Sequence, residues 1–298
     1  MPVALAAPDF AELTRRLRRE VDAALEEYAT YGDDCPPHLA EAIRHSLLAP
    51  CKRLRPLLVL MSCQACGYDH RNALPAACAV EMIHTYSLIH DDLPAMDDDD
   101  LRRGRPSCHA QFGEATAILA GDALLAQAFE VLATGLPASI AARCCGELAV
   151  AAGACNLVGG QEDDLQGEFS GLGYEQLERI HRRKTGAIIR VSLRLGALVA
   201  GADDEKLAAL DTYGENLGLA FQIVDDLLDL SGNEASLGKR TGKDSGHGKL
   251  TFPAVLGEAE SRRRAGELAA AASDSLAPFG SPAAGLEALA RYVVERDH

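Results

Sequence analysis

Two clusters of aspartates constrain this sequence more than any other feature. The first has six acids within ten residues, 91–100, and directly follows an apolar run. The second lies in the segment LGLAFQIVDDLLDLSG and consists of Asp225, Asp226 and Asp229. Each cluster ends a predicted helix, where the partial negative charge of the last carbonyls disfavours carboxylates. Two helices with the same unfavourable ending indicate that cations bind between them, across one cavity.

The oxygen-only character of both clusters favours magnesium, which binds through one or two carboxylates together with phosphate oxygens and water. Asp225 and Asp229 are four residues apart and share a helix face, with Asp226 beside it. Apolar residues surround these three acids, so a missing counter-ion would carry a large desolvation cost. For residues 97–100 a solvated acidic loop is the alternative. The spacing does not fit a calcium loop, which needs a closing glutamate.

Basic residues adjoin both clusters and suggest partners for phosphate groups. Arg102 and Arg103 follow the first cluster, and arginine can bind phosphate oxygens through two parallel hydrogen bonds. Lys52 and Arg55 lie just before a predicted helix, whose first amides also favour anions. Further cations are Lys184 and, in a glycine-rich segment, Lys239, Lys243 and Lys249. Each alone reads as a surface charge, but together they predict two diphosphate pockets, one metal-bridged and one purely cationic.

Apolar periodicity predicts one all-helical domain over residues 1–298. Apolar residues make up 48% of the chain and aromatic residues only 5%, which favours helix. No alternating strand pattern, repeat or low-complexity linker is found. The stretch 159–164 (GGQEDD) is expected to interrupt the helical pattern, and residues 231–250 to form a polar loop. Helices are predicted at 9–30, 38–48, from the turn at 49–56 through Cys66, and at 73–92, 115–134, 140–157, 174–200 and 203–230, with two or three more after the loop.

Charge and cysteine content exclude several classes of protein. The formal charge of −15 argues against a nucleic-acid partner, because phosphate backbones need basic faces. The N-terminus lacks the pattern of a signal peptide, and no run of about 18 apolar residues predicts stable membrane insertion. Nine cysteines, an odd number, indicate reduced thiols and a cytoplasmic protein. The CxxC formed by Cys63 and Cys66 is interpreted as buried and inert.

The motifs carry a resemblance to a known family. HDDLPAMDDDDLRRGRPSCH resembles the first aspartate-rich motif of the trans-isoprenyl diphosphate synthases in its DDxxxxD form. FQIVDDLLDLSGNEASLGKRTGKD resembles the second motif and the loop that follows it. The likeness runs from KRLRP at 52–56 to the ALARYVVER tail, and is closest to short-chain bacterial farnesyl diphosphate synthases. Both motifs in this order are specific, whereas a lone DDxxD also occurs in terpene cyclases.

The resemblance implies an all-α bundle around a central cavity, a homodimer and three magnesium ions, for which manganese can substitute. It implies that the main direct metal ligands are Asp91, Asp97 and Asp225. Contact with metal, directly or through water, would also involve Asp92, Asp226 and Asp229. The family's GQxxD element matches Gln161 and the acid Asp164, a further metal contact.

The resemblance also assigns the diphosphate sites. The allylic diphosphate would be bound by Arg102, Lys184 and Lys239. Isopentenyl diphosphate would be bound by Lys52, Arg55, His84 and Arg103, although a hydrogen-bonded core residue is the ordinary interpretation of His84. The remaining substrate-site residues would be Thr185, Gln222 and Lys249, of which Thr185 and Gln222 lie near the developing carbocation.

The implied reaction is head-to-tail condensation of isopentenyl diphosphate with dimethylallyl and geranyl diphosphate, giving farnesyl diphosphate and pyrophosphate. Pyrophosphate itself would accept the proton. Tyr86 and Ser87 are the chain-length candidates. Tyr86 lies five residues before Asp91, about 7.5 Å along a helix, where its ring could stop growth at fifteen carbons. Ordinary core packing is the alternative for Tyr86.

Other functions stay open on the same residues. The product could be geranyl or geranylgeranyl diphosphate, or the enzyme could couple prenyl groups irregularly. A terpene cyclase would need no isopentenyl pocket, and a non-catalytic partner subunit would usually have lost one aspartate motif. Two positions depart from the family pattern. Pro50-Cys51 replace a Gly-Gly that allows close approach to phosphate, and the tail ends Arg296-Asp297-His298 instead of in a basic terminus.

Overall fold

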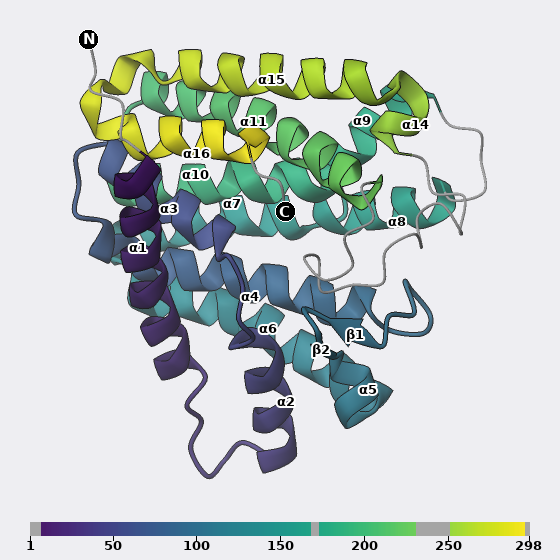
Figure 1. Ribbon diagram of the computed structural model, residues 1–298. Helices are drawn as coiled ribbons and strands as arrows, with labels where there is room; N and C mark the ends of the chain where they lie inside the picture. The colour runs from purple at the N-terminus through teal and green to yellow at the C-terminus, as the bar shows by residue number, and fades with distance from the viewer. Residues whose placement is uncertain (1–6, 168–172, 231–250, 296–298) are drawn as a thin grey trace.

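The computed structural model describes residues 7–167, 173–230 and 251–295, and this part of the chain is almost entirely helical (Figure 1). The longer helices are α1 (Ala7–Tyr28), α2 (Pro37–Leu47), α3 (Leu54–Ala65), α4 (Leu74–Asp91), α6 (Glu114–Gly135), α7 (Ala138–Ala152), α8 (Leu157–Gly167), α9 (Tyr174–His181), α10 (Ala187–Val199), α11 (Asp204–Leu230), α15 (Glu258–Ser275) and α16 (Ala284–Glu295). The short elements are α5 (Cys108–Phe112), α14 (Phe252–Leu256), the strands β1 (Leu101–Arg102) and β2 (Arg105–Pro106), the 3-10 turns η1 (His70–Ala73), η3 (Ala277–Phe279) and η4 (Ser281–Ala283), and the π-helical turn η2 (Arg182–Gly186).

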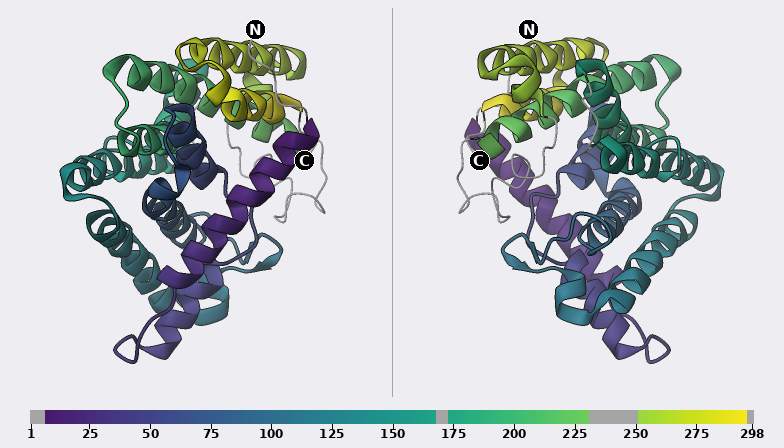
Figure 2. Two further views of the ribbon diagram at one scale, coloured as in Figure 1. Left: turned by 90° about the vertical axis from the view of Figure 1, so that its left-hand side faces the viewer. Right: turned by 90° about the vertical axis from the view of Figure 1, so that its right-hand side faces the viewer.

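The helix α4 is the centre of the bundle. It is apolar around most of its circumference, and the side chains from Ala76 to Ile83 are all buried. Its closest neighbour is α6, which lies beside it (Figure 2). The two helices run antiparallel, since Gly121 lies against His90 and Gly135 against Pro75. A helix buried on all sides holds its last residue, Asp91, at a fixed position.

The carboxyl ends of α4 and α11 lie at the same end of the molecule (Figure 1). The helix α10 packs against α3, α4, α7 and α11, and so joins the two helices that carry the aspartates. The helices α15 and α16 cover the other side of α11. The fold therefore brings together two clusters that are more than 120 residues apart in the sequence, as the opposed-helix hypothesis requires.

Three local expectations need correction. The segment 159–164 does not interrupt a helix but lies within α8. Its glycines allow close contact: a Cβ on Gly159 would lie 1.9 Å from the Ala154 carbonyl oxygen, and one on Gly160 would lie 2.6 Å from the Lys184 amide nitrogen. Two antiparallel strands of two residues each, β1 and β2, form a hairpin after the first acidic cluster, where no strand was expected. Arg55 lies in the first turn of α3 instead of before it.

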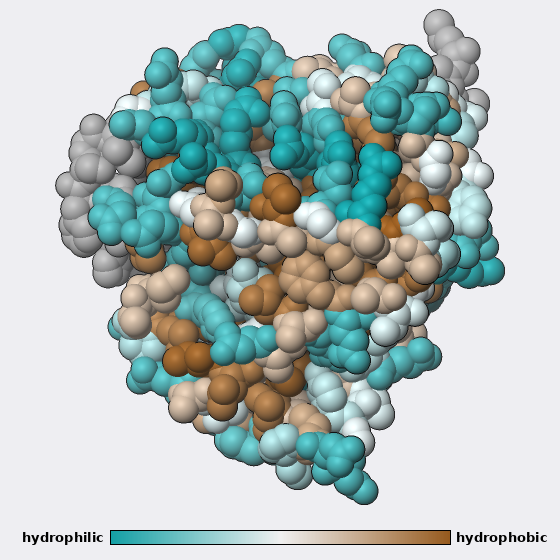
Figure 3. Space-filling model, turned by 180° about the vertical axis from the view of Figure 1, so that it is seen from behind, coloured by the Kyte–Doolittle hydropathy of each residue, from teal (hydrophilic) through white to brown (hydrophobic). Residues whose placement is uncertain are grey.

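The rear face of the molecule, formed by α6 and α7, carries apolar side chains across its middle (Figure 3). Exposed large apolar residues of α6, α7 and α8 are Ile118, Leu119, Val150 and Val158. The sequence has no uninterrupted apolar run that could span a membrane, but by length and composition alone α6 and the segment 138–166 could do so. Only 39% and 28% of their apolar windows are buried. Such helices also occur in soluble proteins, where they form cores or interfaces.

Candidate active site

The first acidic loop folds back over the end of α4. The Asp97 amide donates to the Asp91 carbonyl oxygen at 2.8 Å, and the Asp99 amide donates to the Asp92 carbonyl oxygen at 3.1 Å. The intervening Asp98 has a φ of 51°, in the left-handed region that most residues avoid. The loop thus satisfies the last carbonyls of α4 and returns Asp97 to the neighbourhood of Asp91.

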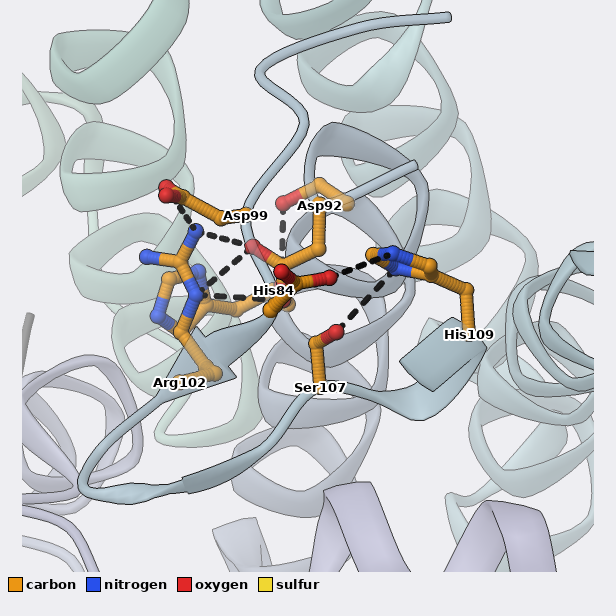
Figure 4. Close-up of polar contacts among 8 residues, drawn as sticks. His84, Asp92, Asp99, Arg102, Ser107 and His109 are labelled. Atoms are coloured by element: carbon orange, nitrogen blue, oxygen red, sulfur yellow. Dashed lines mark hydrogen bonds and ion pairs between the residues drawn. The ribbon is translucent and has the colours of Figure 1, made fainter. Parts of the chain in front are cut away.

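Arg102 is held by acids of this loop (Figure 4). Its Nε lies 2.8 Å from Asp92 Oδ1, its Nη2 contacts the same carboxylate, and Asp99 Oδ2 is 3.7 Å away. The Asp92 side chain is only 3% exposed. The hairpin that positions Arg102 turns at Arg103 and Gly104, with φ values of 54° and 73°. Two consecutive residues with positive φ are characteristic of a tight hairpin turn, so Arg103 is fixed at the tip.

Asp91 is a buried carboxyl with charges of both signs around it. Burial raises the pKa of Asp91 to about 6; Asp97 and Asp92 act in the same direction, and Lys184 and Arg102 act in the opposite direction. Because the effect of Lys184 exceeds that of Asp97, and that of Arg102 exceeds that of Asp92, the rise comes from burial of the carboxyl. A divalent cation in contact with the ionised carboxylate would offset this cost of burial.

A second group of residues comes from α8 and η2. The Lys184 ammonium lies 2.8 Å from Asp164 Oδ2, and the next residue, Thr185, donates to Gln222 Oε1 at 3.4 Å. A Cβ on Gly218 of α11 would lie 3.1 Å from the Gly186 Cα, so α11 approaches η2 closely. The π-helical turn is thus packed between α8 and α11. Turns of this kind are rare and occur mostly at functional sites.

The second acidic cluster divides into two roles. Asp226 is 6% exposed, and its two oxygens accept hydrogen bonds from Gln222 Nε2 at 3.0 Å and from the Phe252 amide at 2.9 Å. Asp226 therefore anchors α14 to α11 in addition to any contact with metal. Asp225 and Asp229 are half-buried at the end of α11, and the Asp225 charge acts on Arg55 of α3. Lys239, Lys243 and Lys249, like the tail residues 296–298, lie outside the described residues.

The predicted isopentenyl pocket is formed by the start of α3 and the middle of α4. Arg55 Nη1 lies 3.0 Å from His84 Nε2, and burial lowers the pKa of Arg55. Lys52 is exposed, and Arg103 is close enough to Cys51 to lower the pKa of its thiol, against burial and Glu81, which raise it. The Cys51 thiol points to Glu81 Oε1 at 3.5 Å. The Cys51 side chain thus packs toward α4, whereas Pro50 is exposed.

Arg53, between the two predicted ligands, has a role that the sequence analysis missed. Its side chain is 2% exposed and lies 2.8 Å from both Asp22 Oδ1 and Glu81 Oε1, with a φ of 51°. This buried ion pair ties α3 to α1 and α4. Glu81 is the one charged residue in the apolar run 73–83, and that isolation was the available signal.

The chain-length candidates lie on different faces of α4. Tyr86 is 6% exposed, with its ring against His90 at a centroid distance of 5.8 Å. Ser87 donates to the His84 carbonyl oxygen at 2.9 Å. A pocket between α2, α4 and the hairpin, with about 400 Å³ of empty space that includes open solvent, is lined by Asp92, Arg102 and Arg103 and so adjoins the acidic loop. Gln161 is buried, and its amide has no hydrogen-bond partner within the described residues.

The donor set fits magnesium, although the side chains are not in chelating positions. Within the described part of the chain, no group of three or more acid, histidine or cysteine side chains is arranged to hold a metal ion. Asp92 and Asp164 are instead paired with Arg102 and Lys184. The carboxylates lie at two opposed helix ends, they carry excess negative charge, and they offer oxygen atoms only. These are the properties that hard divalent cations require.

Comparisons with known proteins agree with this geometry. A family model described as polyprenyl synthetase matches residues 36–275. The chain is 47% identical to the farnesyl diphosphate synthase of Escherichia coli (strain K12), covering 97% of this chain and 99% of that protein. It is also 47% identical to the chloroplastic geranylgeranyl pyrophosphate synthase of Catharanthus roseus, covering 97% and 82%. The crystal structure of an FPP/GFPP synthase from Zymomonas mobilis superposes with a TM-score of 0.87 at 36% identity, covering 97% and 100%.

Proposed function

The chain belongs to the polyprenyl synthetase family, and we propose that it is a short-chain prenyltransferase whose product is farnesyl diphosphate. It would condense isopentenyl diphosphate head-to-tail with dimethylallyl and then geranyl diphosphate, releasing pyrophosphate. The observation that carries this proposal is the pair of aspartate clusters at the ends of α4 and α11, with Arg102 paired to Asp92 of the first and Arg55 influenced by Asp225 of the second. The part of the site lined by the aspartates suits a metal-bound diphosphate. The group formed by Arg55, His84 and Arg103 suits a second diphosphate, bound without metal.

Magnesium would be held by Asp91, Asp97 and Asp164 on one side of the site and by Asp225 and Asp229 on the other. Asp92 and Asp226 would contribute directly or through water, and three ions would be bound. When bound, the metal would stabilise negative charge on the departing diphosphate.

Arg102 and Lys184 would change partners during substrate binding. In the structure each is paired with a carboxylate, Asp92 and Asp164 respectively. With those carboxylates engaged by metal, Arg102 and Lys184 would be available to the allylic diphosphate, together with Lys239. An arginine fork and a lysine ammonium would then stabilise the leaving group as its charge grows.

Isopentenyl diphosphate would bind between the start of α3 and the middle of α4. Arg55 and His84 already contact each other there, while Lys52 is exposed and Arg103 stands at the hairpin tip. The Thr185 hydroxyl and the Gln222 amide, which are within 3.4 Å of each other, would face the allylic carbocation. Lys249 would complete the substrate site. The departing pyrophosphate would take the proton, so no protein base is assigned.

Tyr86 would set the product length. Its ring is buried five residues before Asp91, where a growing hydrocarbon tail that follows α4 would meet it. The relatives include both farnesyl and geranylgeranyl synthases, so overall identity does not decide between fifteen and twenty carbons. A bulky ring at position 86 favours the shorter product.

We further propose a cytoplasmic homodimer that binds no nucleic acid and does not insert stably into membranes. Nine free cysteines and a formal charge of −15 support the compartment and the absence of nucleic acid. The exposed apolar residues of α6, α7 and α8 support a second copy as the partner of that face.

The test is incubation of the purified chain with magnesium, isopentenyl diphosphate and either dimethylallyl or geranyl diphosphate. Farnesyl diphosphate should be the main product. Twenty-carbon products would indicate the geranylgeranyl alternative, cyclised hydrocarbons a terpene cyclase, and no product a non-catalytic subunit. Asp225→Ala should lower turnover by a factor of at least about 100 without unfolding the protein. Near-normal turnover would remove Asp225 from the metal site.

A further inference from the structure

The ring of Tyr86 is in contact with a second ring that the reaction itself does not require. His90 lies four residues later on α4, so the two side chains share one face. Their centroids are 5.8 Å apart, with an angle of 78° between the planes, which is an edge-to-face arrangement. His90 adjoins Asp91 in the sequence, but its side chain points toward α6 instead of the acids, as its hydrogen bond shows.

His90 is fixed to α6 by two features. Its Nε2 donates to the Ile118 carbonyl oxygen at 3.1 Å, beyond the first turn of that helix. The next turn of α6 presents Gly121, and a Cβ built there would lie 2.1 Å from the same Nε2. Only glycine leaves space for the imidazole at this position. The carbonyl fixes the ring's position, and the missing side chain provides the space it occupies.

The fixed imidazole of His90 limits how far the Tyr86 ring can move. The buried tyrosine ring has α4 on one side and the clamped imidazole on another, so the edge contact restricts its rotation about the side chain. On the side of Tyr86 away from Asp91, the same region of α4 presents Met82 and Ile83, both fully buried. A tail that displaced the Tyr86 ring would have to enter this packed region.

We propose that His90 is a positioning residue that holds Tyr86 in place as the stop for the growing prenyl chain, and that Gly121 is required for this arrangement. The inference rests on the proposed function, because it needs a hydrocarbon tail that reaches Tyr86. It adds a determinant of product specificity that acts through Tyr86 and contacts neither diphosphate. The ligand concerned is the apolar tail of the allylic substrate at the fifteen-carbon stage.

The experiment measures the ratio of products longer than fifteen carbons to farnesyl diphosphate, with radiolabelled isopentenyl diphosphate. Four variants are compared with the wild type: Tyr86→Ala, His90→Ala, the double variant and Gly121→Ala. Gly121→Ala displaces the imidazole from the α6 side and leaves both rings chemically intact. Gly266→Ala on α15 is the matched control, since it lies outside the α6–α8 face and a Cβ there meets nothing within 4 Å. Because products are counted as a ratio, a lower turnover caused by the neighbouring Asp91 does not obscure the result.

The proposal expects the ratio to rise at least tenfold in Tyr86→Ala, in His90→Ala and in Gly121→Ala, and to stay at the wild-type value in Gly266→Ala. It also expects the product ratio of the double variant to be less than twofold higher than that of Tyr86→Ala alone. A wild-type ratio in both His90→Ala and Gly121→Ala, with a raised ratio in Tyr86→Ala, would overturn the clamp and leave the Tyr86 stop intact. The clamp would also be overturned if His90→Ala raised the product ratio by the same factor in the wild type and in Tyr86→Ala. A wild-type ratio in Tyr86→Ala would refute the stop itself, and the clamp with it.

Discussion

At the scale of single residues, the candidate site places unfavourable charge where catalysis would use it. Asp91 ends a buried helix, and its carboxyl is itself buried, which raises its pKa despite the nearby Lys184 and Arg102. Among the described residues, the non-glycine positions with positive φ are Arg53 at the start of α3, and Asp98 and Arg103 in the segment that follows Asp91. Strained backbone of this kind persists where the surrounding structure requires it, and it is common at active sites.

The charge on Asp91 should destabilise the metal-free protein. Its pKa of about 6 in the folded state lies above the ordinary 3.8, so the folded chain binds this proton more tightly than the unfolded chain. Stability from this group therefore falls as the pH rises from about 4 through 6, and stays lower above that. At pH 7.5 without magnesium, Asp91→Asn should have a free energy of unfolding about 1 to 3 kcal/mol above that of the wild type, and so a higher melting temperature. It should also lose most activity. The difference in melting temperature between Asp91→Asn and the wild type should shrink toward pH 5. A variant less stable than wild type at pH 7.5 would contradict this account.

Asp226 should contribute to stability as well as to the site. Two donors, the Gln222 amide and the Phe252 backbone amide, point at Asp226. An asparagine can accept from only one of them without turning its own NH₂ toward the other. Asp226→Asn should therefore lower the free energy of unfolding by about 1 to 3 kcal/mol in urea titrations. Wild-type stability of Asp226→Asn would show that the anchor to α14 is unimportant.

The residue types of the site could be predicted from the sequence, but their division of labour could not. The clusters and arginines stand out because charged residues rarely follow long apolar runs. Whether Arg53 or Arg55 faces the pocket depends on the left-handed conformation at Arg53 and on its pairing with Glu81, an acid 28 residues away. Likewise, nothing local distinguishes Asp225 from Asp226, because the hydrogen bond that anchors Asp226 comes from Phe252, 26 residues later.

At the scale of elements, helices with a clear apolar period were predicted well, and the site's special turn was not. The segments 73–92 and 203–230 match α4 and α11 to within a residue at each end. The Gly159-Gly160 pair was interpreted as a break, because glycine is found both at interruptions and at close approaches. Tertiary contact decides which applies. The π-helical turn at 182–186 has no periodic signature, since it lies inside one continuous helical stretch.

Close packing of α8 against η2 should be necessary for binding the allylic diphosphate. A Cβ at position 160 would lie 2.6 Å from the Lys184 amide nitrogen, so Gly160→Ala must displace the turn that carries Lys184 and Thr185. We expect kcat/KM for geranyl diphosphate to fall at least about tenfold, with a loss of about 1 to 3 kcal/mol in stability. Gly266→Ala on α15, where a Cβ meets nothing within 4 Å, should keep full activity and be slightly more stable. Wild-type kinetics in Gly160→Ala would show that η2 tolerates displacement.

At the scale of the whole molecule, the bundle has a reactive end and an apolar rear face. The all-α architecture follows from composition and period, and the approach of two distant helix ends follows from charge, because two anionic ends need a shared cation. The exposed face could not be distinguished from core in the sequence, since both are apolar and helical. Only the structure shows that Ile118 and Leu119 on α6 are 44% and 56% exposed.

This rear face should be covered by a second copy of the chain. The helices α6 and α7 expose apolar side chains that water would otherwise contact, and α6 also supplies the carbonyl and the glycine that hold His90. Leu119→Lys should therefore convert a dimer into monomers in sedimentation velocity, because two lysines would be buried in a symmetric interface. Tyr68→Lys, at a residue that is 48% exposed but lies outside α6–α8, is the matched control and should remain dimeric. If both variants and the wild type sediment as monomers, the apolar face has another partner. If Leu119→Lys remains dimeric, the interface lies elsewhere. Because α6 borders both the interface and α4, the monomeric variant should also make longer products than the dimer, measured as the same product ratio.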